Sequence, residues 1–400
     1  MIVGNGAGLH NTRYVITLDA DTGLPAGAAL ALVATAAHPL NQPIHDAETN
    51  VVISGYGMLQ PRMEPRRAAS DPPTRYQALA MDPKSPAEAP VLADAQHRLF
   101  AGGAFYGKGL YDVLAVDRAL RSRLPNDWVL SHDLLEGCFA RCGSCPDITL
   151  TETLPSTAVT DSKRRHRWIR GDWQSAPWAL PIAPTKTGLW QRNPLPWLAR
   201  WRVFENIRRA MWPIACFSLL FLLSCLDPAA GVGVWGLLAL IYLVPLALTN
   251  LYWLTQRAAT VSLAVHLAFA LRCFTLHAGR ALIAMALLPS DAVLAVRAGC
   301  KAVWRMCRGG RQALEWTASD RAEREATAGI AGHIRAMLAG PSAAAVLIGY
   351  GAASSARGSG LLAVLWAASP LLAWWLSRPS ASDTQCHAGA VADPPDEGTL

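Results

Sequence analysis

Three short groups of residues in the first half of the chain carry side chains suited to chemistry. In the first group, Asp19 and Asp21 stand two positions apart, directly after the β-branched run at residues 14–18. Such a run predicts a buried strand. Two carboxylates at the end of a strand can share a divalent metal, which would neutralise a diphosphate leaving group. A solvated acidic turn is the alternative, because an Asp-x-Asp pattern also recurs by chance.

The second group is the sequence Ser131-His-Asp-Leu-Leu-Glu136. Asp133 and Glu136 are three residues apart, so on a helix they share a face, and one of them could serve as a general base. Ordinary helix capping is the alternative, with Ser131 as the N-cap and the acidic residues in the first turn. Taken alone, these residues favour capping.

The third group spans residues 164–174 and holds four arginines and two tryptophans. Arginine makes charge-assisted contacts with phosphate, and a tryptophan ring offers a flat apolar surface for stacking. A nucleic-acid patch or a membrane-surface helix would use similar residues. A merely solvated basic face suits the pattern less well, because Trp168 and Trp173 need burial or a ligand.

Three cysteines, Cys138, Cys142 and Cys145, have the spacing of an iron–sulfur triad that leaves one iron open. That motif normally lies early in a repeated βα barrel, and the sequence shows no such repetition. The first cysteine also falls within an expected helix at residues 134–141. Free thiols are therefore favoured over a cluster.

The elements that must position these groups form an α/β unit over residues 1–180. Strands are expected at 14–18, 51–53 and 127–130, an alanine-rich helix ends near His38, and residues 63–95 predict a surface loop. A strand that ends in acidic residues and leads into a helix is typical of an open α/β sheet. In such sheets ligands bind at the carboxyl ends of the strands.

The second half of the chain predicts a membrane region. Residues 181–209 form a basic connector, and from 210 to 256 the only charged residue is Asp227. That stretch is long enough for a transmembrane hairpin. Arg208, Arg209 and Arg257 flank its outer ends, so the positive-inside rule places the α/β unit in the cytoplasm.

Residues 257–335 are apolar but punctuated by basic residues, which favours amphipathic helices in the membrane interface and a linker. A second apolar hairpin is expected at 336–378, giving about four spans, and a disordered tail at 379–400. The chain has 400 residues, 52% of them apolar, which excludes a disordered protein. Nine cysteines are too few for a disulfide scaffold, and the first twelve residues contain no signal-peptide core.

In this order the groups resemble a processive glycosyltransferase of the GT-A type, and longer motifs resemble the glycosyltransferase module of cyclic β-1,2-glucan synthases. The resemblance runs from about residue 12 to about residue 379. The motifs that carry it are Arg13-Tyr-Val-Ile-Thr-Leu-Asp-Ala-Asp-Thr22, Gly57-Met-Leu-Gln-Pro-Arg62, Gly107-Lys-Gly-Leu-Tyr-Asp-Val113, Leu130-Ser-His-Asp-Leu-Leu-Glu-Gly137, His166-Arg-Trp-Ile-Arg-Gly-Asp-Trp-Gln174, Arg200-Trp-x4-Asn-x-Arg-Arg209 and Leu314-Glu-Trp-Thr317.

The resemblance implies a membrane enzyme that transfers glucose from UDP-glucose to the 2-hydroxyl group of a growing glucan. Asp19 and Asp21 would hold Mg²⁺ or Mn²⁺ on the diphosphate, and Asp133 would deprotonate the acceptor for inverting attack. Arg167 and Trp168 would bind near the diphosphate and the acceptor sugar. The expected partners are UDP-glucose, a glucan acceptor and membrane lipids, with no nucleic acid.

Three further residues are expected to bind donor or acceptor: Gln60, Arg62 and Trp173. Aromatic side chains such as Trp173 suit the faces of a glucose ring.

The sequence departs from the family in two respects. Arg164 stands where the wider class has the Gln of a QxxRW motif. A complete GT-A domain also has two further βα units before its Asp-x-Asp strand, and these synthases carry further modules at both ends. We therefore expect a fragment of a larger synthase. An inactive remnant and a polysaccharide synthase of different linkage are the alternatives.

Overall fold

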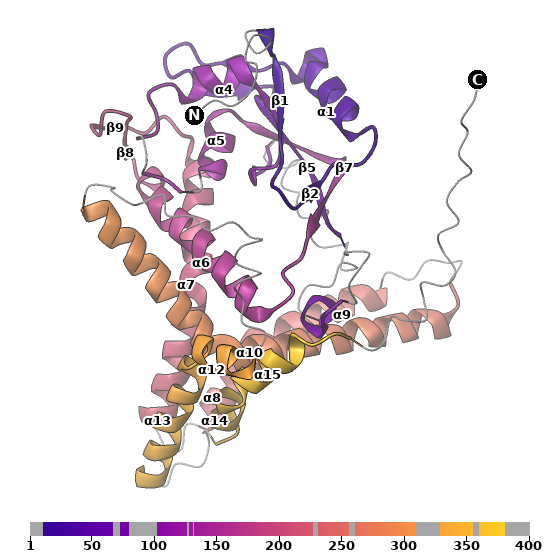
Figure 1. Ribbon diagram of the computed structural model, residues 1–400, viewed down its shortest axis with the longest axis vertical. Helices are drawn as coiled ribbons and strands as arrows, with labels where there is room; N and C mark the ends of the chain where they lie inside the picture. Colours follow the sequence, from indigo (N-terminus) through magenta and orange to yellow (C-terminus); the bar gives the residue numbers. More distant parts are fainter. Residues whose placement is uncertain are drawn as a thin grey trace.

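The computed structural model of the protein describes residues 11–66, 73–79, 102–125, 128–130, 132–226, 231–255, 261–308, 329–354 and 360–380. These residues form an α/β region followed by a helical region, which lies below the sheet in Figure 1. The expected α/β class is confirmed to that extent.

A five-stranded sheet forms the centre of the α/β region, in the order β1-β6-β5-β7-β2. Its strands are β1 (Tyr14–Thr17), β2 (Thr22–Gly23), β5 (Met58–Arg66), β6 (Gly109–Asp112) and β7 (Cys142–Thr153). Strands β5 and β7 are parallel, and the other neighbours are antiparallel. The sheet is therefore mixed, and β1, which leads to the acidic pair, lies at its edge beside β6.

The two faces of the sheet bury different clusters, because successive side chains of a strand point to opposite sides. Leu59 packs with Leu110 and Leu150 against α1 (Ala28–Ala37). The buried residues of α1 repeat every four positions, as expected for one helical face. Its neighbour Met58 belongs to the other cluster, which includes Phe105 and the helix α5 (Asp133–Phe139).

The remaining elements of this region surround the sheet. They are η2 (Pro39–Asn41), β3 (Ile44–His45), β4 (Val52–Ser54), α2 (Arg75–Leu79), α4 (Val113–Leu120), α6 (Ala158–Ser175), η3 (Ala176–Ala179), β8 (Ile182–Pro184) and β9 (Trp190–Arg192). The strand expected at 51–53 exists, but it pairs with β3 in a separate two-stranded sheet.

Two expectations for the α/β region are corrected. Residues 128–130 are not a strand, while 127 lies outside the described residues. The segment 63–95, expected to be a loop, begins with the end of β5 and contains α2, and much of the rest of it lies outside the described residues. Both errors arise because short apolar or Pro-rich stretches have no clear period.

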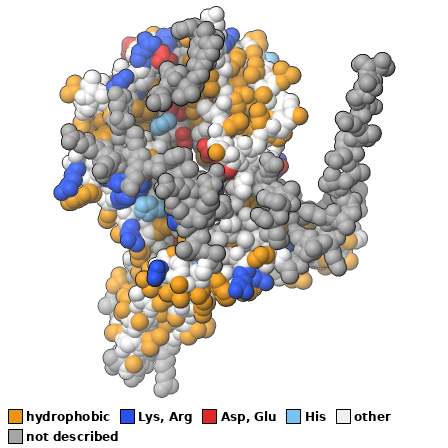
Figure 2. Space-filling view, in the orientation of Figure 1, with side chains coloured by type: hydrophobic (Ala, Val, Ile, Leu, Met, Phe, Trp, Pro, Cys, Tyr) orange, Lys and Arg blue, Asp and Glu red, His pale blue; other side chains and the backbone are white. Residues whose placement is uncertain are grey.

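The helical region comprises α7 (Trp197–Leu226), α8 (Gly231–Leu238), the π-helical η4 (Ala239–Leu243), α9 (Val244–Thr255), α10 (Leu263–Cys307), α12 (Ile330–Ala336), α13 (Ala339–Ser354), α14 (Gly360–Ala367) and α15 (Ser369–Leu376). Side chains of α7, α8, α13 and α14 pack into one apolar cluster that includes Leu220, Leu347 and Trp366. In Figure 2 this lower part is largely hydrophobic, and Lys and Arg side chains lie where it meets the upper part.

Three described helices are long and apolar enough to cross a membrane: Trp197–Cys225, Gly233–Tyr252 and Leu263–Cys307. The bent pair Ile330–Ala336 and Ala339–Ala352 would make a fourth if it counts as one span. Helix α7 already starts within the stretch assigned to the connector, which therefore contains helix at its end.

Helix α10 is a single helix of 45 residues, and by length and composition it qualifies as a span. The sequence had instead favoured interfacial helices there. The part of α10 beyond Pro289, coloured orange in Figure 1, lies against α6 of the α/β region. Arg165 of α6 pairs with Asp291 at 2.9 Å, and Trp173 contacts α10 at Gly299. Helix α10 thus connects the helical region to the α/β region.

Candidate active site

The acidic pair lies in the turn that follows β1. The backbone N–H of Thr22 donates to the carbonyl of Asp19 at 3.0 Å, which closes this turn between β1 and β2. Burial raises the pKa of Asp21, its own backbone hydrogen bond lowers it, and the negative charges of Glu152 and Asp19 raise it further. Several carboxylates therefore share a small volume at the edge of the sheet.

A buried lysine lies among these carboxylates. The Lys108 ammonium is 3.1 Å from Asp19 Oδ2 and 2.9 Å from Glu152 Oε1, and only 9% of its side chain is exposed. Burial alone would lower the lysine's pKa, but the two carboxylates more than offset this and raise it. Lys108 therefore stays charged and bridges the Asp-x-Asp turn to β7.

The same bridge leads to the basic helix. Arg164 Nη1 is 3.3 Å from Glu152 Oε1, and the Arg164 guanidinium lies 4.5 Å from the centre of the Trp168 ring. Positions 164, 167 and 168 share one face of α6, because residues three and four apart on a helix are neighbours. An unbroken series of contacts thus connects Asp19 to Trp168, whose ring remains 43% exposed.

Asp133 is the first residue of α5, and it lies close to the loop that carries Lys108. Gly107 has a φ of +83°, and a Cβ atom there would lie 3.0 Å from Asp133 Oδ2 and 3.1 Å from its Cγ. The Thr17 hydroxyl, at the end of β1, donates to the Gly107 carbonyl at 3.1 Å. The glycine therefore allows the Asp133 carboxylate to approach the end of β1.

Arg167 is the group on which these charges act together. Burial lowers the pKa of its guanidinium, and the charges of Asp19, Asp21 and Asp133 oppose this by raising it, while Arg164 lowers it. The acidic pair and the expected base therefore all favour the charged form of this arginine of the basic helix. These were the residues of three separate sequence motifs.

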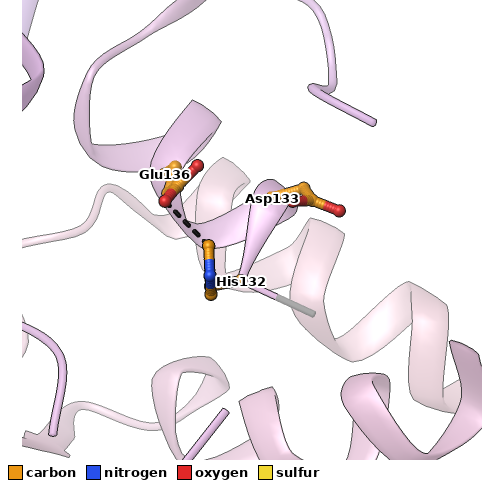
Figure 3. A group of neighbouring side chains, drawn as sticks. All are labelled: His132, Asp133 and Glu136. Atoms are coloured by element: carbon orange, nitrogen blue, oxygen red, sulfur yellow. Dashed lines mark ion pairs between the residues drawn. The ribbon is translucent and has the colours of Figure 1, made fainter. Parts of the chain in front are cut away.

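The side chains of His132, directly before α5, and of Tyr111, on β6, both contact Glu136 of α5; Figure 3 shows the His132–Glu136 pair. His132 Nδ1 is 2.7 Å from Glu136 Oε1, and the Tyr111 hydroxyl donates to Glu136 Oε2 at 3.3 Å. The hydrogen bond to Glu136 raises the pKa of His132, against the effect of burial. Glu136 is thus occupied by two partners, whereas Asp133 points in a different direction in Figure 3.

His132, Asp133 and Glu136 have ligand atoms within 4.8 Å of one another, which is the only such group of three among the described residues. Cys138, Cys142 and Cys145 do not form such a group. Their thiols are buried, and burial raises the pKa of Cys138 and of Cys145 to about 12. Because a thiolate is the form that binds metal, this environment favours the free thiols.

The other predicted binding residues lie around this site in different ways. Gln60 is buried, and its Oε1 accepts from the backbone N–H of Tyr106 at 2.8 Å, which fixes the loop before Gly107. Arg62 pairs with Glu64 at 3.0 Å on β5. Trp173 contacts α10 at Gly299.

Two residues of the site were missed as functional candidates from the sequence, Lys108 and Glu152. Lys108 lies inside the Gly107-Lys-Gly motif, and its position between two glycines was the available signal. No sequence signal marked Glu152, because a single acidic residue in a threonine-rich strand is common.

No family model matches the sequence. The chain is 30% identical over 389 residues to the cyclic beta-(1,2)-glucan synthase NdvB of Rhizobium meliloti (strain 1021). The alignment covers 94% of this chain and 13% of that protein, so the chain spans only a small part of the length of its curated relative. The resemblance inferred from the motifs is confirmed, and nearly the whole chain is similar to one segment of a cyclic β-(1,2)-glucan synthase.

Proposed function

We propose that the chain is the glycosyltransferase segment of such a synthase, with a GT-A-like α/β domain. It transfers glucose from UDP-glucose to the 2-hydroxyl of a growing β-1,2-glucan, with inversion at the anomeric carbon. The observation that carries the proposal is that adjacent residues of one loop contact both groups: Lys108 lies 3.1 Å from Asp19 Oδ2, and a Cβ atom on Gly107 would lie 3.0 Å from Asp133 Oδ2.

The donor side of the site has the residues that a sugar diphosphate needs. Asp19 and Asp21 would hold Mg²⁺ or Mn²⁺, and such a cation, when bound, neutralises the charge of the leaving diphosphate. Burial is the main cause of the raised pKa of Asp21, and the charges of Glu152 and Asp19 add to it; a divalent cation would offset both effects. Arg167 adds a fixed positive charge for the phosphates.

The acceptor side needs a base and a surface for the sugar. The Asp133 carboxylate takes the proton of the acceptor 2-hydroxyl, and the oxygen attacks the anomeric carbon from the face opposite UDP. The bond from that carbon to the diphosphate oxygen breaks, and UDP leaves with the electron pair. The exposed ring of Trp168, held beside Arg164, offers the stacking surface.

The location that we propose is the bacterial inner membrane, with the α/β region in the cytoplasm. Arg200, Arg202, Arg208 and Arg209 occur in the first turns of α7, next to the α/β region, as the positive-inside rule requires for a cytoplasmic end. The apolar helices beyond them would anchor the site at the membrane surface, close to where a growing polymer would leave.

The test is incorporation of radiolabelled glucose from UDP-glucose into polymer by membranes that contain the chain, followed by linkage analysis. We expect metal-dependent incorporation and 1,2-linked product. A 1,3- or 1,4-linked product would identify a synthase of different linkage. No incorporation, together with no binding of UDP, would identify an inactive remnant.

A further inference from the structure

The Lys108 ammonium lies where it must compete with a cation for Asp19. Its Nζ is 3.1 Å from Asp19 Oδ2, on the carboxylate that the proposed function assigns to the metal, and 2.9 Å from Glu152 Oε1. Almost the whole lysine side chain is buried, whereas 57% of the Asp19 side chain is exposed. The lysine is therefore held in place, while the carboxylate is open to a ligand from solvent.

The contacts around Lys108 explain why it is held there. Lys108 is preceded by Gly107, which lies against Asp133, and is followed by β6, which pairs with β1. The backbone on both sides of Lys108 is therefore fixed by contacts. Glu152 comes from β7 and also receives Arg164. Lys108 and Arg164 thus neutralise Glu152 from two sides, and Lys108 retains charge with which to bind Asp19.

We propose that Lys108 is a built-in counter-cation that keeps divalent metal out of the Asp19 site until a nucleotide diphosphate arrives. Without nucleotide, the ammonium satisfies Asp19 and repels a second cation. A diphosphate brings negative charge that Lys108 can bind in place of Asp19, so the carboxylate becomes available to the metal. Metal and nucleotide then bind together, and each strengthens the binding of the other.

This arrangement has a thermodynamic consequence. If UDP strengthens metal binding, the metal must strengthen UDP binding by the same factor. The size of this factor depends on the competition between the Lys108 ammonium and the metal for Asp19. Removing the charge of Lys108 must therefore make the metal bind more tightly without nucleotide. It must also reduce the factor by which UDP and the metal strengthen each other's binding. Loss of a merely structural contact predicts the opposite, because a disordered Asp19 would bind metal more weakly.

The inference rests on the proposed function for the identity of the metal ligand, and it is tested with Mn²⁺ alone and with UDP. Mn²⁺ binding to the purified full chain in detergent is measured by electron paramagnetic resonance of the free ion, with and without UDP. The variants are Lys108→Met, which removes the charge, and Lys108→Arg, which keeps it. Arg121→Met is the matched control, because it removes a cation from the exposed carboxylate of Asp117 in α4.

We expect Lys108→Met to bind Mn²⁺ at least about tenfold more tightly than the unmodified chain in the absence of UDP, and each tenfold corresponds to about 1.4 kcal/mol. The increase in Mn²⁺ affinity that UDP causes should be smaller by a similar factor. Lys108→Arg and Arg121→Met should bind Mn²⁺ as the unmodified chain does. Unchanged or weaker Mn²⁺ binding in Lys108→Met would overturn the inference. Failure of UDP to bind any variant would instead refute the proposed function, and the titration without nucleotide would still decide whether Lys108 excludes the metal.

Discussion

Replacing Gly107 by alanine tests whether the loop before β6 positions Asp133. The glycine has a φ of +83°, and an added Cβ atom would lie 3.0 Å from Asp133 Oδ2 and 3.1 Å from Asp133 Cγ. These separations are shorter than ordinary van der Waals contact, so the carboxylate must move by a few tenths of an ångström. The movement displaces it from its position beside Gly107.

The size of the effect follows from two separate costs. The left-handed conformation costs an L-residue such as alanine about 1–2 kcal/mol, which lowers the free energy of unfolding. Displacement of a reacting group by 1 Å costs about a hundredfold in rate, so a displacement of a few tenths of an ångström should reduce kcat by about threefold to tenfold. UDP binding should not change, because Gly107 contacts the base and not the acidic pair.

The assay is glucose transfer from UDP-glucose, with UDP affinity measured on the same preparation. Gly188→Ala is the matched control. Gly188 has a φ of +80°, and among the described residues nothing lies within 4 Å of its added Cβ atom. Both variants should lose a similar free energy of unfolding, and only Gly107→Ala should lose kcat. Equal kcat values in the two variants would refute the placement of Asp133.

Three further predictions concern charged groups around the site. Burial raises the pKa of Asp172 to about 6, above an unfolded value near 3.9. The free energy of unfolding should therefore fall as pH rises from about 4 to 6. Asp172→Asn should remove this pH dependence and add up to about 3 kcal/mol to the free energy of unfolding at pH 7, as chemical denaturation at several pH values would show. Arg165→Met leaves the carboxylates of Asp161 and Asp291 without their shared cation. The change should lower the free energy of unfolding by about 2–3 kcal/mol. An unchanged stability in thermal unfolding would contradict this prediction. Glu136→Gln removes the carboxylate whose hydrogen bond, and secondarily whose charge, raises the pKa of His132, so an NMR titration should find that pKa lower; an unshifted value would mean that another group controls it.

Local sequence patterns were sufficient for much of the α/β region. The β-branched run before Asp19 forms β1, and the alanine-rich stretch ending near His38 forms α1. The order of strands was not predictable, because β1 pairs with β6 almost a hundred residues later. Such long-range pairing depends on the packing of both faces of the sheet, which no local pattern contains.

The candidate site was predictable as residue types but not as an arrangement. Asp19, Asp133 and Arg167 each belong to a motif with an ordinary structural alternative, and function is favoured by the contacts that Lys108 and Gly107 make with Asp19 and Asp133. The Gly107-Lys-Gly motif marked the position of Lys108, but it contained nothing about which groups the lysine contacts. Its contacts with Asp19 and Glu152 arise from three separate segments of the chain.

The helical region was predictable in composition and less so in geometry. A low charge density between residues 210 and 256 indicated apolar spans, and α7, α8 and α9 are found there. The basic residues of α10 suggested an interfacial helix, yet α10 is one continuous helix that packs on α6. A hydrophobic pattern records which face is apolar, but it does not record whether lipid or another helix covers that face.

The most direct test of the proposed transferase is Asp133→Asn in the full chain, with glucose transfer and UDP binding measured side by side. The amide retains the size of the carboxylate but cannot accept the acceptor's proton. General-base removal typically costs about 10²–10⁴-fold, so transfer should fall by at least a hundredfold while UDP affinity stays within about twofold. Transfer at the unmodified rate would contradict the assignment of Asp133 as the base and with it the proposed mechanism.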